Sequence, residues 1–245
     1  MLNFDFYNPT RIAFGKGKVA EIDKLVPAEA RVLIVYGGTS AKKNGTLDEV
    51  KAALGGRYAE EFSGIEPNPT YETLMKAVSK IKANKLDYLL AVGGGSVIDG
   101  TKFVAAAVYA EGDPWEILLK RGANVKQAMP YGTVLTLPAT GSEMNDGSVI
   151  SRTETASGLH DKLYFTSEHV FPQFSVLDPS KSSQEHEQAK QALDRSLTQY
   201  APPGTELLIR TGNKPSEVVL QQLAEGDYDL LVLGGHHQRH DFFSG

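Results

Sequence analysis

Apolar residues along the chain form short unbroken runs, separated by stretches of helical period. Residues 32–36 and 89–92 are apolar throughout, without the alternation of a half-exposed strand. Such runs are typical of strands buried on both faces of a parallel sheet. Between them, 70–81 repeats apolar positions at helical spacing, with Leu74 and Ile81 on one face. This order predicts an α/β fold with a Rossmann-like, doubly wound and mainly parallel sheet.

Shorter segments, bounded by glycine, proline and asparagine, complete the predicted fold. We expect two short strands within 2–14, helices over 17–26 and 42–54, strands at 57–62, 133–137 and 175–177, and a hairpin of 149–152 with 162–165.

Both buried runs lead into glycine. Residues 37–40 read Gly-Gly-Thr-Ser, and residues 93–96 read Gly-Gly-Gly-Ser. Ser96 stands where a helix N-cap is expected, and Asp99 resembles the acidic partner of a capping box. A strand, a glycine turn and a helix N-terminus together predict an anion site, because N–H groups and the helix dipole converge there. A plain tight turn is the alternative interpretation.

Residues 138–143, Pro-Ala-Thr-Gly-Ser-Glu, follow the strand predicted at 133–137. A loop with so many hydroxyl and backbone donors can wrap a cofactor. It can equally be a polar surface loop, and the composition leaves both interpretations open.

Composition excludes several classes of function. The net charge is −5, which provides no basic surface for nucleic acid. There are no cysteines, so disulfides, thiol nucleophiles and cysteine-bound metals are excluded. The N-terminus resembles no signal peptide, and no segment reaches the roughly 18 apolar residues of a membrane span. We expect a cytoplasmic protein with no nucleic-acid or membrane partner.

Taken together, these motifs resemble the iron-containing alcohol dehydrogenase family, in its branch of NADPH-dependent butanol dehydrogenases and aldehyde reductases. The resemblance covers residues 1 to about 179. The stretches that carry it are 9–12, 14–17, 64–69, 91–103, 135–143 and 176–179.

The resemblance implies a dinucleotide site. Gly94, Gly95 and Ser96 would hold the pyrophosphate, and the turn at 37–40 would meet the adenosine ribose. NAD-preferring relatives carry an acid near that turn, whereas Thr39 and Ser40 stand here and favour NADP(H). The candidate cofactor residues are Gly37, Gly38, Thr39, Ser40, Asn68, Gly94, Gly95, Ser96, Asp99, Thr136, Thr140, Ser142 and Lys162.

The remaining candidates have separate roles. The resemblance places Asn68, Thr136, Thr140 and Ser142 along the adenosine and nicotinamide-ribose side, and Lys162 at a ribose or phosphate. We interpret Asp99 as a cap or a backbone acceptor rather than a proton donor.

Family members hold iron or zinc with an aspartate and three histidines on a following helical domain. The helix that begins this domain in the family is not found at 180–186. We therefore expect no metal and no catalytic residue. His236, His237 and His240 share a helical spacing but are interpreted as a solvated tail.

Residues 185–244 resemble the second half of a universal stress protein, on 212–219, 227–234 and 236–239. His237 replaces a glycine of the nucleotide-binding members, so ATP binding is not expected. The two resemblances predict a chimera: a dinucleotide-binding domain at 1–180, and at 181–245 an α-β-α-β segment that extends the sheet, docked or swapped in a homodimer.

The main hypothesis is an engineered or fused protein that keeps an NADP(H) site without catalysis, and therefore is not an enzyme. The first alternative is an active NADPH-dependent aldehyde reductase or alcohol dehydrogenase. The others are a folded recombinant without a ligand and an ATP binder of the stress-protein kind.

Overall fold

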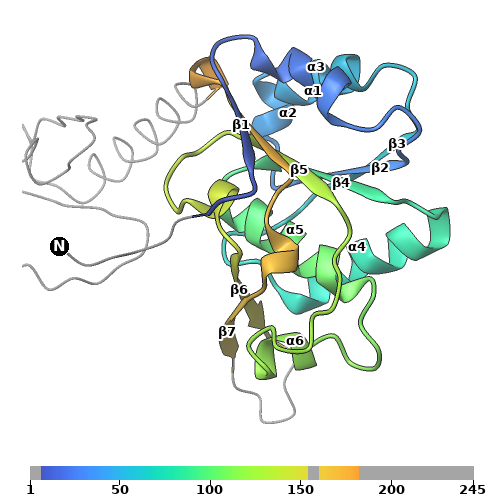
Figure 1. Ribbon diagram of the computed structural model, residues 1–245, viewed down its shortest axis with the longest axis vertical. Helices are drawn as coiled ribbons and strands as arrows, with labels where there is room; N and C mark the ends of the chain where they lie inside the picture. Colours follow the sequence, from blue (N-terminus) through green and yellow to red (C-terminus); the bar gives the residue numbers. More distant parts are fainter. Residues whose placement is uncertain (1–6, 154–159, 182–245) are drawn as a thin grey trace, which may run out of the picture. The chain divides into compact units, whose positions relative to one another are not determined.

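A computed structural model describes residues 7–153 and 160–181 of the chain (Figure 1). Contacts divide the chain into two compact units, Met1–His186 and Glu187–Gly245. All described residues belong to the first unit. The resemblance of 185–244 to a stress protein, the histidines at 236–240 and the expected α-β-α-β extension therefore lie outside the described residues.

A six-stranded parallel sheet forms the centre of the described unit, which confirms the predicted fold class. The strands follow the order β1-β8-β5-β4-β2-β3 across the sheet. They are β1 (Arg11–Phe14), β2 (Val32–Tyr36), β3 (Ala59–Phe62), β4 (Tyr88–Gly93), β5 (Tyr131–Leu135) and β8 (Phe174–Leu177). β2 and β4 are buried along their whole length, as their apolar runs predict.

The order of the strands places a topological switch point between β2 and β4. The chain passes from β2 outward to β3, then returns to the other side of β2 to form β4, and continues through β5 to β8. In such sheets a crevice forms where the winding direction reverses, outside the carboxyl ends of the two central strands. The two glycine turns predicted from the sequence follow those two strands.

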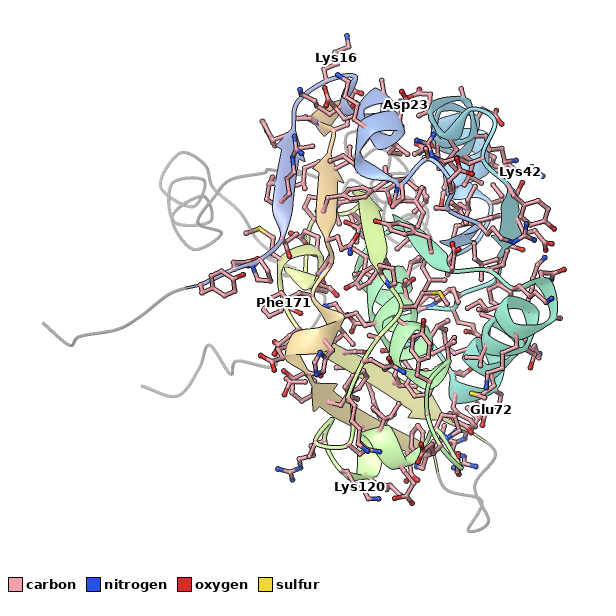
Figure 2. All side chains as sticks on the ribbon, turned by 45° about the vertical axis from the view of Figure 1, so that its right-hand side comes forward. Lys16, Asp23, Lys42, Glu72, Lys120 and Phe171 are labelled. Atoms are coloured by element: carbon pink, nitrogen blue, oxygen red, sulfur yellow. The ribbon has the colours of Figure 1, made fainter. Side chains whose placement is uncertain are left out.

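Helices cover both faces of the sheet (Figure 1). One face packs on α1 (Ile22–Leu25), α2 (Ser40–Lys43) and α3 (Thr46–Leu54), and the other on α4 (Tyr71–Asn84) and α5 (Gly95–Ala107). Strand side chains alternate between them, since Val32 and Ile34 belong to the first apolar cluster and Leu33 and Val35 to the second. Figure 2 shows side chains filling both layers, with Lys16 and Lys120 pointing outward at opposite ends.

An antiparallel hairpin stands apart from the main sheet. It consists of β6 (Gly147–Arg152) and β7 (Asp161–Thr166) and confirms the hairpin predicted at 149–152 and 162–165. β6 packs on α5, and α6 (Glu116–Leu119) packs on β7. Short 3-10 turns complete the unit at Lys18–Glu21, Ser142–Met144 and Glu168–Val170. None of the helices in the described ranges has the length and apolarity needed to cross a bilayer.

Two predicted helices differ from the observed ones. The helix expected over 42–54 is two helices, because Gly45 takes a left-handed φ of 77° and the side chain of Asn44 accepts a hydrogen bond from the N–H of Thr46 at 3.1 Å. The helix expected over 17–26 begins with a 3-10 turn at 18–21 before α1. By contrast, α4 begins as predicted, since the Thr70 hydroxyl accepts from the N–H of Thr73.

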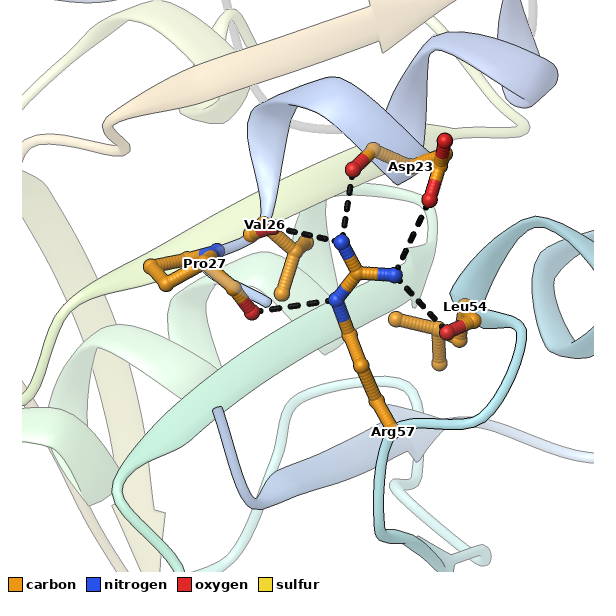
Figure 3. A network of polar contacts seen from close by, with 5 residues as sticks. All are labelled: Asp23, Val26, Pro27, Leu54 and Arg57. Atoms are coloured by element: carbon orange, nitrogen blue, oxygen red, sulfur yellow. Dashed lines mark hydrogen bonds and ion pairs between the residues drawn. The ribbon is translucent and has the colours of Figure 1, made fainter. Parts of the chain in front are cut away.

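A single arginine joins the ends of α1 and α3 (Figure 3). The guanidinium of Arg57 donates to the carbonyl oxygens of Asp23, Val26, Pro27 and Leu54 at 2.6, 3.0, 3.0 and 2.8 Å. It also meets the Asp23 carboxylate at 3.1 Å. Helices leave their last carbonyl groups without partners, and a buried guanidinium satisfies several at once. The Arg57 side chain is only 9% exposed, whereas that of Asp23 is 68% exposed.

We expect Arg57→Ala to lower the free energy of unfolding by about 2–3 kcal/mol, because it removes the guanidinium's hydrogen bonds to four carbonyl groups, two of them part-buried. Chemical denaturation of the full chain measures this loss.

Asp23→Ala is the matched control for the ion pair. It removes only the exposed carboxylate and should cost less than about 1 kcal/mol. Equal losses in the two variants would show that the ion pair, rather than the carbonyl groups, carries the stabilisation.

Candidate functional site

The predicted site residues gather at the carboxyl edge of the sheet. Tyr36 at the end of β2 pairs with Val92, and Gly93 at the end of β4 pairs with Leu135. The segments that follow these strands, 37–40, 94–96 and 136–142, therefore leave the sheet side by side. Their common starting edge is the one that carries the switch point.

The turn after β4 opens α5 without a side-chain cap. Gly94, in an extended conformation with φ −88° and ψ −168°, is the N-cap. The N–H groups of Val97 and Ile98 make the first bonds of the helix, both to the carbonyl of Gly94 at 3.1 and 3.2 Å. The prediction of Ser96 as N-cap is wrong, because the glycines let the helix begin earlier. The N–H groups of Gly95 and Ser96 thus stand at a positive helix end with no carboxylate in the first turn.

Close packing explains why glycine occupies these turns. A Cβ at Gly95 would lie 2.7 Å from the Cγ2 of Thr140 and still nearer its hydroxyl oxygen. A Cβ at Gly93 would lie 2.6 Å from the Cγ2 of Val97, and one at Gly37 would lie 3.2 Å from the carbonyl oxygen of Ile65. The hydroxyl-rich loop therefore sits directly on the N-terminus of α5, with Thr140 next to Gly95.

Asn68, Ser96 and Lys162 also come together. The N–H of Asn68 donates to the Ser96 hydroxyl at 3.4 Å, and Asn68 has a left-handed φ of 60°. The ammonium group of Lys162, on β7, donates to the side-chain oxygen of Asn68 at 2.7 Å. Asn68 and Lys162 are exposed. A cation thus lies two hydrogen bonds from the uncapped helix end, which adds to its attraction for an anion.

Asp99 and Ser142 face the interior of the protein. The buried Ser142 hydroxyl donates to the Asp99 carboxylate at 2.5 Å, and the N–H of Val149 donates to its other oxygen at 3.1 Å. Burial raises the pKa of Asp99, and the hydrogen bond from Ser142 opposes that shift. Asp99 is therefore no part of a capping box, and both side chains already have protein partners.

Sequence reasoning missed Lys102, a fully buried lysine on α5. Its ammonium group donates to the Ser142 hydroxyl at 2.9 Å, to the Asn145 side-chain oxygen at 2.7 Å and to the Gly147 carbonyl at 2.8 Å. Burial lowers its pKa to about 8. One signal was available: Asp99 and Lys102 are the charged residues of an otherwise uncharged stretch at 97–110, three positions apart on a helix.

The remaining candidates differ in exposure. Gly38 and Thr39 are exposed and Ser40 is partly buried, on the loop and first turn that lead into α2. Thr136 is 1% exposed, and its hydroxyl has no hydrogen-bond partner among the described residues. Its N–H donates to the carbonyl of Gly93 at 3.1 Å, so Thr136 lies beside the glycine turn. A buried, unpaired hydroxyl at this position is a polar group that a ligand can satisfy.

A metal ion does not fit the described part of the chain. Within 7–153 and 160–181, no group of three or more histidine, cysteine, aspartate or glutamate side chains is placed to bind one. We derive no chemical step through a metal at these residues.

Comparison with known proteins identifies relatives of this fold and site. The model of the family described as "Iron-containing alcohol dehydrogenase" matches residues 9–179. The NADPH-dependent aldehyde reductase YqhD of Escherichia coli (strain K12) is 58% identical over 181 residues, which cover 73% of this chain and 46% of the relative. The probable NADH-dependent butanol dehydrogenase 1 of Bacillus subtilis (strain 168) is 48% identical over 182 residues, with coverage of 73% and 46%.

Solved structures agree with this match. The crystal structure of E. coli K-12 YqhD superposes with a TM-score of 0.70 at 56% identity, over 74% of this chain and 46% of that one. The NADH-dependent butanol dehydrogenase A of Thermotoga maritima gives a TM-score of 0.68 at 39% identity, over 74% and 45%. The chain thus spans about half the length of the relatives it matches.

These matches overturn two expectations. The hypothesis of an engineered or fused chimera without catalysis is wrong, because the relatives are aldehyde reductases and alcohol dehydrogenases and support the first alternative instead. The expectation that no metal is needed is also wrong, since the matched family is defined as iron-containing. The expectation was based on the absence of the family's metal-binding helix at 180–186. The sequence of that one stretch does not determine whether the family needs a metal.

We expect Thr136→Val to raise the free energy of unfolding by about 1 kcal/mol, because valine has the same shape and leaves no buried hydroxyl unpaired. Denaturation in urea, without ligand, measures the change.

Thr133→Val, on β5 just before Thr136, is the matched control. The Thr133 hydroxyl donates to Ser175 at 2.8 Å, so its removal should lower stability by about 1 kcal/mol. A loss at Thr136 as large as at Thr133 would contradict an unpaired hydroxyl at Thr136.

Proposed function

Because the chain belongs to the iron-containing alcohol dehydrogenase family, we propose that residues 1–180 are a dinucleotide-binding domain and that the protein is an NADPH-dependent aldehyde reductase. The observation that carries the proposal is the uncapped N-terminus of α5 at the switch point between β2 and β4. Free N–H groups, a positive dipole end and glycines that admit close approach are what a pyrophosphate requires.

Three further features support a dinucleotide. The exposed Lys162 lies on the same side as Ser96, through Asn68, and supplies a positive charge near the phosphates. The unpaired Thr136 hydroxyl offers a hydrogen bond at the end of β5. Residues 37–40, of which Gly38 and Thr39 are exposed, would continue the site beyond β2. Its Thr39 and Ser40 present hydroxyl donors rather than a carboxylate, which favours the 2′-phosphate of NADP(H) over the 2′-hydroxyl of NAD(H).

In the proposed reaction, hydride passes from the nicotinamide of NADPH to the carbonyl carbon of an aldehyde, and a proton from solvent adds to the oxygen. The products are NADP and an alcohol. A metal of the kind the family is named for would supply Lewis acid chemistry at the carbonyl, and its ligands are not among the described residues. The described residues bind the cofactor and orient it, which determines where the hydride is presented.

The proposal includes a prediction of the oligomeric state. We expect a homodimer, as the sequence indicated, and sedimentation of the full chain would test it.

We expect the full chain to bind NADPH more tightly than NADH, as measured by the change in nicotinamide fluorescence on titration. Gly95→Ala should weaken NADPH binding by about tenfold or more, because its Cβ would displace Thr140 from the helix end.

Gly56→Ala is the matched control, since a Cβ there meets nothing within 4 Å and Gly56 lies outside the site. Oxidation of NADPH by butanal, with ferrous iron added, then tests the reaction. Failure of the parent chain to bind NADPH at millimolar concentration would refute the proposed function.

A further inference from the structure

Lys102 lies two helical turns beyond Gly95 on α5 and is fully buried. A charged lysine in the interior is unfavourable unless its donors are satisfied. All three of its hydrogen bonds go to one segment, 142–147, through Ser142, Asn145 and Gly147. The lysine therefore joins α5 to the loop that follows β5.

A second side chain of α5, Asp99, also holds the 142–147 segment. The Ser142 hydroxyl accepts from Lys102 and donates to Asp99, one turn closer to the glycine turn. Asp99 also accepts from the N–H of Val149. The segment is thus held at two successive turns of α5.

The same segment carries Thr140, which rests on Gly95. The N–H of Ser142 donates to the Thr140 hydroxyl at 3.3 Å, so the residue held by Lys102 also orients the residue at the helix end. A shift of the segment would move Thr140 relative to the free N–H groups of Gly95 and Ser96.

We propose that Lys102 is a positioning residue for the cofactor, whose buried ammonium group holds the 140–147 segment against α5 and thereby sets the affinity for NADP(H). This inference rests on the proposed function.

The charge state of Lys102 provides a readout that a purely structural contact lacks. Its pKa is about 8, lowered by burial against the attraction of Asp99, Asp146 and Glu143. Burial raises the pKa of Tyr131 on β5 and of Tyr164 on β7, and the charge of Asp99 adds to both shifts, whereas the charge of Lys162 lowers the pKa of Asp99. As pH rises through the pKa, the ammonium loses a proton and one of its three donors. Affinity for NADPH should therefore be full below that pH and fall above it.

The experiment measures the Kd of NADPH by fluorescence from about pH 7 to about pH 9.5, for the parent chain and Lys102→Met. The parent Kd should rise by about tenfold across this range. Lys102→Met should bind about tenfold more weakly at about pH 7 and show no rise. Lys82→Met, which changes an exposed lysine on α4, should match the parent.

Circular dichroism shows whether Lys102→Met folds. If it does not fold, the inference is tested by the pH dependence of the parent's Kd for NADPH and by the Kd of Ser142→Ala. Ser142→Ala should weaken NADPH binding by about threefold to tenfold. A flat parent profile, or parent-like affinity in a folded Lys102→Met or Ser142→Ala, would overturn the inference and leave the proposed function intact. A parent chain that binds no NADPH would overturn both.

Discussion

The close approach of the hydroxyl-rich loop to the N-terminus of α5 is the contact on which the site depends. It requires glycine at 95, because any side chain there would collide with Thr140. It also requires the helix to begin without a side-chain cap, so that N–H groups remain for a ligand. Both conditions occur where two buried strands end beside a switch point. The order of the strands therefore determines where the site chemistry can form.

The contact between the loop and α5 is held by two charged side chains in the interior, Lys102 and Asp99. A buried lysine is unfavourable by itself, and a buried pair is weak evidence of net stabilisation. Here the charge is distributed over an ordered set of partners: Lys102 donates to a hydroxyl, an amide and a carbonyl oxygen, and Asp99 accepts from a hydroxyl and an N–H. A network with so many satisfied groups gives a segment one preferred position, which apolar packing alone specifies less sharply.

Much of the fold could be predicted because its main signals are local. Unbroken apolar runs predicted β2 and β4, and the helical spacing of apolar residues over 70–81 predicted α4. The start of α5 was misplaced because Ser96 satisfies a local capping pattern that glycine overrides. Lys102 was missed for a different reason. Its partners lie 40 to 45 positions away in sequence, and a lysine on a helix is usually solvated.

The metal raises a different difficulty, since its absence was expected from a missing sequence motif rather than from contacts in the structure. The parts of the proposed cofactor site, which are the strands, the switch point, the glycine turn and the covering loop, all belong to one unit. The packing of the described residues follows from the strand order and from close contacts at glycines. A cofactor domain can therefore be well formed whether or not its residues supply metal ligands. For that reason, nicotinamide binding and metal binding have to be established by separate measurements on this chain.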